Sequence, residues 1–285
     1  MELWLVYSIL GYSIGAVAGT LDKHMMNQRY NPVTTVLLRT LFNGLFLGTT
    51  GFLLLHLSIT PTVVLFAAVP AFLLAISFVV YLGVLQRRNV TEIQPFSQSL
   101  DTLFIFLAAL VFLNEQANLP NYIGILLVVI GIYLVLTEHI RKAPRLDRNL
   151  LIIIALVPID VAYALLVKTY LADAEPIALA VCIYLMAFLM LTIVSLLFRK
   201  KSNITAASLK PQIRIVLVAS LCAATAAGFL YTALSQGNAS KVYPMAGVSS
   251  IAVFFFATMF LREHFHWHRF IGTLIVVGGI YLISV

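Results

Sequence analysis

A stretch of 23 residues, FLNEQANLPNYIGILLVVIGIYL from Phe112 to Leu134, recurs 148 residues later as FLREHFHWHRFIGTLIVVGGIYL from Phe260 to Leu282. The two copies are identical at 12 of 23 positions. Both copies are apolar enough to lie in lipid, and each closes one half of the chain. The pattern predicts a duplicated membrane unit, an arrangement that is frequent among transporters and holds substrate between the repeats.

The composition is typical of an integral membrane protein. Hydrophobic residues make up 61% of the 285 residues and charged residues only 10%, against about 25% charged residues in a soluble domain. Mean hydropathy is +1.01. The net charge of +7 would suggest a nucleic-acid surface in a soluble protein, but here most Lys and Arg lie between apolar segments, where they set membrane orientation. No nucleic-acid partner is expected.

Ten apolar segments meet the length of roughly 20 residues that a helix needs to cross the bilayer core. The first segment lacks a basic n-region and a small-residue cleavage site, so we interpret it as a membrane helix and not as a removed signal peptide. The predicted helices cover residues 3–22, 33–57, 61–85, 93–113, 119–137, 149–171, 176–198, 212–236, 241–261 and 267–284.

Ten segments divide into five plus five. This division predicts a first repeat at 1–138, a linker at 139–148 and a second repeat at 149–285. Because each repeat has an odd number of helices, consecutive insertion places the two in opposite orientations about a pseudo-two-fold axis in the membrane plane. We therefore predict an all-α polytopic membrane protein, with ten transmembrane helices as a 5+5 inverted-topology repeat around a central cavity.

The distribution of charge predicts an orientation. Of the 18 Lys and Arg residues, 15 follow odd-numbered segments, Lys23 among them, and two follow even-numbered segments, Lys168 among them; Arg39 lies inside the second segment. The positive-inside rule then places the odd loops in the cytoplasm and both termini outside.

The ends of both halves, with EIQPF at 92–96 and KVYPM at 241–245, resemble the two EamA domains of the drug/metabolite transporter (DMT) superfamily. The resemblance covers essentially the whole chain. It implies a ten-helix inverted-repeat fold in the cell (plasma) membrane, which exports or exchanges small metabolites by alternating access. Relatives handle amino acids, drugs, nucleotide sugars, sugar phosphates and choline, so the resemblance does not fix the substrate. Many relatives are expected to have both termini inside the cell, against the charge count.

The strongest candidate site is a polar stripe in the fourth segment. Gln94, Ser97, Gln98 and Asp101 follow one another at i, i+3, i+4 and i+7 and share one helix face. A charge at mid-membrane costs at least about 2.5 to 3.5 kcal/mol, so Asp101 needs water, a proton or a partner. We expect this stripe to bind substrate. The alternative is interhelical hydrogen bonding that only holds the bundle together.

A second acid, Asp160, lies near the middle of the sixth segment, two residues after Pro158. Proline kinks a helix, and Tyr163 shares the face of Asp160. Together they predict a lining position with an aromatic wall for a cation. A buried, protonated carboxyl bonded to a hydroxyl group is the alternative.

Two basic residues leave more than one interpretation open. Arg39 could meet a substrate carboxylate or phosphate, pair with Asp22 or snorkel toward a basic loop, and we favour a structural role. Lys241, at the start of the ninth segment, has the same alternatives, and we favour a surface lysine.

Tyrosines are candidates for the cavity wall because their rings attract ammonium groups, by about 0.5 to 2 kcal/mol each. Tyr81 and Tyr231 are repeat partners, and Tyr243 and Tyr7 join them as predicted site residues. Plain packing is the alternative for each ring.

Residues that recur in both halves are expected to serve architecture. Gly124 and Gly131 lie seven residues apart in the fifth segment, and Gly272 and Gly279 lie likewise in the tenth. Small residues at this spacing allow close helix contact. Substrate recognition is expected where the two copies differ.

The sequence lacks a nucleophile motif, a phosphate-binding glycine loop and a full metal-ligand spacing. His264 and His268 could bind a metal weakly, but no third ligand is visible and a solvated loop is favoured. Cys182 and Cys222 lie inside apolar segments without disulfide or metal spacing. We expect no enzymatic activity, no metal and no cofactor other than a possible coupling proton.

These observations predict a secondary transporter, a permease, exporter or exchanger, of a small polar metabolite or drug. An amine or cation is favoured because the deepest charges, Asp101 and Asp160, are acidic. Arg39 and Lys241 support the alternative of an organic-anion, phosphate-ester or nucleotide-sugar exchanger. A membrane-embedded lipid enzyme and a non-transporting assembly partner are less favoured. The expected partners are a small-molecule substrate and the lipid bilayer, with the chain as a monomer or homodimer.

Overall fold

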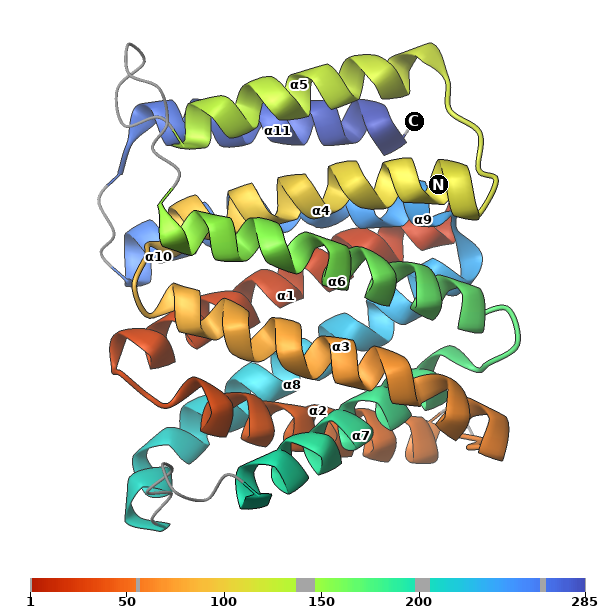
Figure 1. Ribbon diagram of the computed structural model, residues 1–285, viewed down its shortest axis with the longest axis vertical. Helices are drawn as coiled ribbons and strands as arrows, with labels where there is room; N and C mark the ends of the chain where they lie inside the picture. Colours follow the sequence, from red (N-terminus) through yellow and green to blue (C-terminus); the bar gives the residue numbers. More distant parts are fainter. Residues whose placement is uncertain (1, 55–56, 137–146, 198–205, 262–264, 285) are drawn as a thin grey trace.

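A computed structural model describes residues 2–54, 57–136, 147–197, 206–261 and 265–284 (Figure 1). These ranges contain helices and no strand. Residues 139–146 of the predicted linker, and His264, lie outside the described residues. The helices are α1 (Leu3–Asn27), α2 (Pro32–Leu54), α3 (Pro61–Leu85), α4 (Val90–Phe112), α5 (Leu119–Leu136), α6 (Arg148–Tyr170), α7 (Pro176–Leu197), α8 (Ala206–Gln236), α9 (Ala239–Val242), the 3-10 helix η1 (Tyr243–Met245), α10 (Ala246–Phe260) and α11 (Trp267–Ser284).

The predicted all-α polytopic membrane protein is confirmed. Within the described residues, eight helical spans are long and apolar enough to cross a membrane, and two shorter apolar helices cover Leu119–Val135 and Trp267–Ile283. The predicted ninth helix is interrupted, because α9 passes into the 3-10 turn η1 before α10 begins. Pro244 lies inside η1, where its missing N–H removes a helical hydrogen bond.

Two lysines assigned to loops lie inside helices. Lys23 belongs to α1, which continues to Asn27 because Met25 and Met26 are buried against the bundle. Lys168 belongs to α6. The charge count that treated both as loop residues is therefore wrong, although the predicted helix 149–171 already contains Lys168. Each aliphatic stem is packed within the bundle, and each ammonium group donates to backbone carbonyls.

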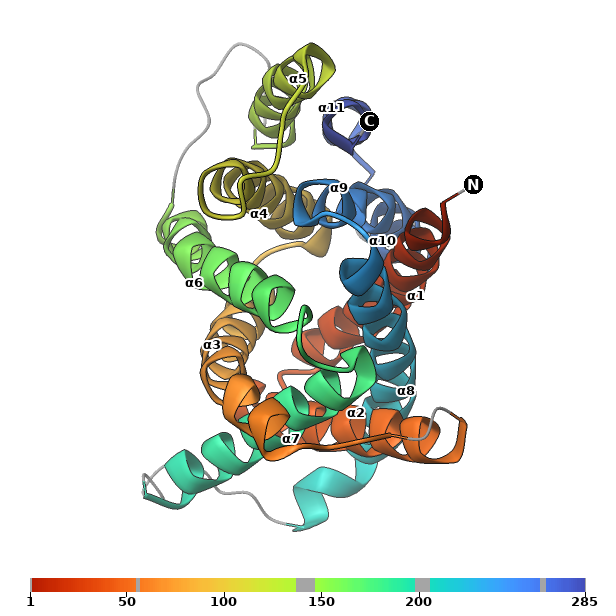
Figure 2. The ribbon, with the colours of Figure 1, turned by 90° about the vertical axis from the view of Figure 1, so that its right-hand side faces the viewer.

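The helices form three zones along the vertical axis of Figure 1. At one end α5 packs along α11, and this pair covers α4 and α10. At the other end α2 packs on α7. Between them lie α1, α3, α4, α6, α8 and α10, which Figure 2 shows end-on, and all of these except α10 line a central space. Contacts of α1 with α8 and α10, of α4 with α10, and of α6 with α3 and α4 connect these helices.

Glycine explains the close crossing of α5 and α11. A Cβ atom on Gly279 would lie 2.6 Å from the carbonyl oxygen of Gly124, and one on Gly131 would lie 2.8 Å from that of Gly272. Only glycine leaves room for backbones at this separation. The predicted close contact between these repeated glycines is confirmed.

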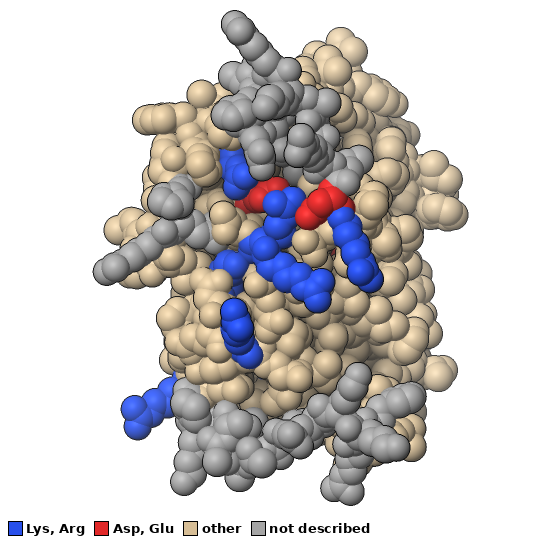
Figure 3. Space-filling view, turned by 60° about the vertical axis from the view of Figure 1, so that its left-hand side comes forward, with Lys and Arg blue, Asp and Glu red and all other residues tan. Residues whose placement is uncertain are grey.

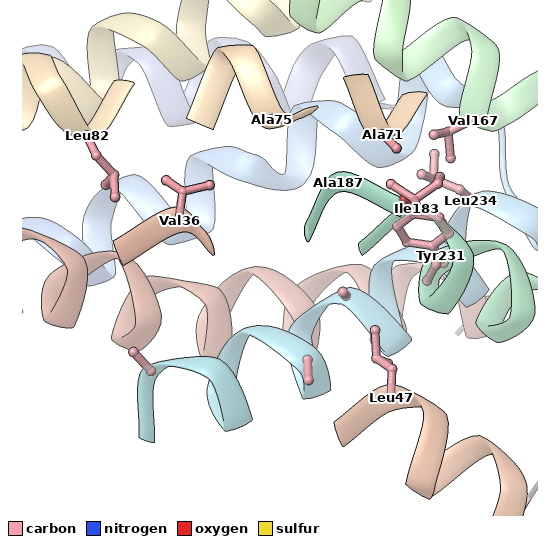
Figure 4. Close-up of a cluster of buried hydrophobic side chains, with 14 of the residues drawn as sticks. Val36, Leu47, Ala71, Ala75, Leu82, Val167, Ile183, Ala187, Tyr231 and Leu234 are labelled. Atoms are coloured by element: carbon pink, nitrogen blue, oxygen red, sulfur yellow. The ribbon is translucent and has the colours of Figure 1, made fainter. Parts of the chain in front are cut away.

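The main hydrophobic core lies beside the central space, where α2, α3, α7 and α8 meet (Figure 4). Branched side chains such as Val36, Leu82 and Ile183 are fully buried there. Ala71, Ala75 and Ala187 leave space for them between the helices. This core fixes the walls that carry the polar side chains described below.

A network of ion pairs lies where α3 ends and α4, α6 and α11 begin. Arg88 pairs with Glu92 at 3.5 Å and with Asp147 at 3.3 Å, and Arg269 pairs with Glu92 at 3.6 Å. Figure 3 brings this side of the molecule forward and shows Lys and Arg gathered around acidic side chains. The network joins both halves of the chain. It lies on the side of the molecule that carries most of the described basic residues.

Candidate functional site

A central cavity of about 440 Å³ lies between α1, α2, α3, α4, α6, α7, α8 and the α9–η1 segment. Helix α2 contributes Arg39 and Asn43 to the lining, and α7 contributes Tyr184. The predicted site residues that line the cavity are Gln94, Ser97, Gln98, Asp101, Asp160, Tyr163, Tyr81, Tyr231, Tyr243 and Arg39.

Two candidate residues, Tyr7 and Lys241, do not line the central cavity. The ring of Tyr7 stacks on Phe229, with ring centroids 6.0 Å apart, and does not line the central cavity. Lys241 lines a separate polar pocket with Glu115 and Asn121. The structure therefore does not bring Tyr7 or Lys241 to the two central acids.

Asp101 and Asp160 face the same cavity from α4 and α6. The Ser97 hydroxyl donates to Asp101 Oδ2 at 3.3 Å, and the Ser77 hydroxyl donates to Asp160 Oδ1 at 2.5 Å. Asp101 Oδ1 is buried and has no hydrogen-bond partner in the described part of the chain. Neither carboxyl forms an ion pair with a described residue.

Arg39 forms a buried ion pair with Asp22. Arg39 Nε lies 3.1 Å from Asp22 Oδ1, and Arg39 Nη2 donates to Asp22 Oδ2 at 3.2 Å. The two side chains are only 3% and 8% exposed, and the guanidinium also stands over the ring of Phe78. The predicted pairing with Asp22 is confirmed, and it balances the positive charge that Arg39 brings to the cavity.

The polar stripe of α4 has two different environments. Gln94 and Gln98 each donate a side-chain amide hydrogen to the Ser249 hydroxyl at 2.9 Å. The Ser250 hydroxyl donates to the side-chain oxygen Oε1 of Gln98 at 2.5 Å. These bonds join α4 to α10, as the structural alternative predicted. Asp101 has no such bond to α10 and remains available to a molecule in the cavity.

Six tyrosines line the cavity: Tyr12, Tyr81, Tyr163, Tyr184, Tyr231 and Tyr243. The hydroxyl groups of Tyr163 and Tyr231 are 2.6 Å apart, which links α6 to α8. Tyr12 donates to the Tyr243 carbonyl oxygen at 3.4 Å. The rings thus form an aromatic wall around the two acids.

Polar or aromatic lining residues outside the predicted site set include Tyr12, Asn43, Ser77 and Tyr184. A helical signal was present for two of them. Ser77 precedes Tyr81 by four residues, and Asn43 follows Arg39 by four, so each shares a face with a selected residue. Among the described residues, no group of three or more His, Cys, Asp or Glu could hold a metal ion.

A bundle of membrane-spanning helices around a cavity with several polar side chains fits the architecture of a membrane transporter. The model of the EamA-like transporter family matches residues 2–137 and 148–285. The chain belongs to this family, and is an EamA-type member of the drug/metabolite transporter superfamily with two EamA domains.

Several solved structures share the fold, and one of them, a crystal structure, has a TM-score of 0.71 and 13% sequence identity. The similarity covers 98% of this chain and 94% of the other. At this identity it establishes the fold alone. A comparison with curated proteins gave no match.

Proposed function

We propose that this protein is a secondary transporter that carries a small organic cation or amine across the plasma membrane through the central cavity. One observation carries the proposal: Asp101 and Asp160 share the cavity, and neither has a cationic partner among the described residues. A carboxylate in the membrane interior requires compensation. A substrate ammonium group or a coupling proton would supply it, and no other cofactor is invoked.

The balance of charge favours a cation. Asp22 neutralises Arg39, so the remaining ionisable groups that face the cavity as carboxylates are Asp101 and Asp160. Tyrosine rings around them add cation–π attraction. The cavity volume of about 440 Å³ lies within the range of pockets for small organic ligands, which is about 300 to 1,000 Å³.

Alternating access would follow from two inverted five-helix repeats, 1–138 and 149–285, joined by the linker 139–148. The helix contacts support this proposal because they come in matching pairs. The contact of α1 with α8 matches that of α6 with α3, and the contact of α1 with α10 matches that of α6 with α4. Rocking of one repeat against the other would expose the cavity to each side in turn. The basic loops that follow the odd-numbered predicted segments would face the cytoplasm.

An organic anion or phosphate ester is the alternative substrate. It is supported by Arg39 Nη1, which has no hydrogen-bond partner in the part of the chain that the structure describes. The ion pair with Asp22 and the position of Lys241 outside the central cavity count against it. A lipid enzyme is less favoured because the family consists of transporters, and an assembly partner would not need two acids in a cavity.

Counterflow into proteoliposomes tests the proposal. Labelled choline, a neutral amino acid and a sugar phosphate are compared for the wild type and for Asp101→Asn and Asp160→Asn. We expect choline to be taken up and each substitution to lower uptake at least tenfold. The matched control is Asp173→Asn in the exposed α6–α7 turn, which should transport normally. Undiminished choline uptake by Asp101→Asn, or preference for the sugar phosphate, would contradict the cation proposal.

A further inference from the structure

The four-residue helix α9 lies across one end of the central cavity. It contacts α1, α4, α6 and α8, which are four of the helices that line the cavity. In Figure 1 it lies at the end of the bundle where α4 ends. Its last residue, Val242, is 1% exposed and lines the cavity together with Tyr243 of η1. We call residues 238–245 the crossing segment; they comprise Asn238, α9 and η1.

The other side of the crossing segment faces a polar pocket of about 460 Å³. Asn238, Ser240 and Lys241 line this pocket together with polar residues of the range 114–121, where α4 connects to α5. So many polar side chains would be costly in lipid, which places the pocket at a water-facing end of the bundle. Lys241 and Val242 are consecutive, so the crossing segment forms one wall of the polar pocket and one wall of the central cavity.

A carboxylate from the other half of the chain holds the crossing segment. The side chain of Glu115 accepts hydrogen bonds from the N–H groups of Ala239 at 3.1 Å and of Ser240 at 3.0 Å. N–H groups at the start of a helix lack intrahelical partners, and a negative charge there is stabilising. Asn114 has a φ of +53°, in the left-handed region, and turns the chain after α4 so that Glu115 reaches α9.

The far end of the crossing segment is less regular. Helix α9 passes into the 3-10 turn η1 around Pro244, whereas α4 runs through Pro95 without interruption. A 3-10 stretch between helical segments often marks a hinge. The contact of η1 with α1 is weak, because the Tyr12 hydroxyl donates to the Tyr243 carbonyl oxygen at 3.4 Å, beyond the usual length of such a bond.

We propose that the crossing segment is a gate between the polar pocket and the central cavity, which Glu115 holds closed and which turns about η1 to open. Burial of Val242 corresponds to the closed gate. Release of Ala239 and Ser240 from Glu115 frees α9 from the first half of the chain, and its movement joins the pocket to the cavity. The gate rests on the central cavity as the transport path, and not on the charge of the substrate.

The reaction of a cysteine at position 242 with a charged maleimide tests the gate in purified protein in detergent micelles. We expect Val242→Cys to react slowly while Glu115 is present and at least tenfold faster when Glu115→Ala is added. Glu115→Gln keeps one acceptor oxygen and should have a smaller effect. Val167→Cys, at a cavity-lining position of α6 that is 0% exposed, should respond in the same direction and serves if the first variant does not fold.

The matched control is Asn121→Ala in the same polar pocket. The Asn121 amide donates to the carbonyls of Leu282 and Ile283 on α11, so its loss disturbs the pocket without releasing α9. It should leave the reaction at position 242 unchanged. The native Cys182 on α7, which is 6% exposed, reports general unfolding, and mass spectrometry reads each cysteine separately.

The outcomes separate a gate from a helix cap. If position 242 reacts equally fast with and without Glu115, the carboxylate only caps α9 and the gate is overturned. The gate is also overturned if Asn121→Ala accelerates the reaction as much as Glu115→Ala, or if Cys182 becomes reactive together with position 242, because the loosening is then general. The reaction requires no substrate, so a failure of choline transport would overturn the cation proposal and leave this result unaffected.

Discussion

Lys23 and Lys168 each donate two hydrogen bonds to backbone carbonyls at the C-terminal end of another helix. The ammonium group of Lys23 on α1 donates to the carbonyls of Leu85 and Arg88 at 2.8 and 2.7 Å. That of Lys168 on α6 donates to the carbonyls of Leu234 and Gly237, both at 2.8 Å. Leu85 and Leu234 lie in the last turns of α3 and α8, where helix carbonyls lack intrahelical partners, and Arg88 and Gly237 follow these helices. A cation there also compensates the negative end of the helix dipole.

Substituting either lysine with methionine should destabilise the helix end that the lysine caps. The aliphatic stem is retained, so the loss reports the two hydrogen bonds, and bonds to a charged donor contribute about 1.5 to 3 kcal/mol. Lys23 is only 4% exposed, whereas Lys168 is partly exposed. We therefore expect Lys23→Met to lose about 3 kcal/mol and Lys168→Met less, measured by unfolding in mixed detergent micelles. Equal stability of Lys23→Met and the wild type would show that water replaces the ammonium group at Leu85 and Arg88.

Gly279→Ala should weaken the packing of α5 on α11. The added methyl group would lie 2.6 Å from the Gly124 carbonyl oxygen and 2.8 Å from the Val128 nitrogen. Neither backbone atom can move without shifting a helix, and overpacking of this kind costs about 1 to 3 kcal/mol. The matched control is Gly278→Ala, where nothing lies within 4 Å of an added Cβ. It should be neutral or slightly stabilising, because alanine favours helix. A similar loss for both variants would contradict the packing role.

Local patterns predicted much of this fold because they act within one helix. Apolar segments of membrane length identified the helices, and the i, i+3, i+4, i+7 spacing placed Gln94 and Asp101 on one face. The pattern could not separate their roles, since the partner of Gln94 is Ser249, 155 residues away. Sequence also did not show that Pro95, in EIQPF, lies in continuous helix while Pro244, in the corresponding KVYPM, lies in a 3-10 turn. Such differences depend on contacts between distant helices.

Asp147 contributes both a helix cap and a charge, and two substitutions separate them. Its carboxyl accepts from the Leu150 N–H at 3.0 Å at the start of α6 and pairs with Arg88 at 3.3 Å. Asp147→Asn keeps a capping oxygen, whereas Asp147→Ala should lose the cap, at about 1 kcal/mol. The measurement is unfolding at neutral pH. Equal stability of the Ala and Asn variants would exclude a capping contribution.

The pH dependence of stability gives an independent measure of the Asp147 charge. Desolvation acts to raise the pKa of this carboxyl, but hydrogen bonds from Leu150 and Asn149 and the Arg88 guanidinium outweigh it and lower the pKa below its usual value. A depressed pKa stabilises the folded state above the unfolded pKa, and this contribution is lost as pH falls through the folded pKa. As the pH falls below about 4, the wild type should therefore lose slightly more stability than Asp147→Asn. Parallel plots of the free energy of unfolding against pH for the two proteins would contradict this.

The ion pair of Asp22 with Arg39 should control both stability and the sign of the charge that the cavity accepts. Removing one partner of a buried pair costs about 3 to 5 kcal/mol, whereas replacing both with apolar residues is often neutral. We expect Asp22→Leu to be severely destabilised and Asp22→Leu/Arg39→Met to recover most of the loss. The milder Asp22→Asn leaves the Arg39 charge unbalanced beside the two free acids, so choline uptake should fall several-fold. Asp22→Asn/Arg39→Gln should restore it, because the net charge of the cavity is again that of Asp101 and Asp160. If Asp22→Asn transports choline like the wild type, Arg39 does not act on the substrate through its charge, and the neutralisation that favours a cation loses its basis.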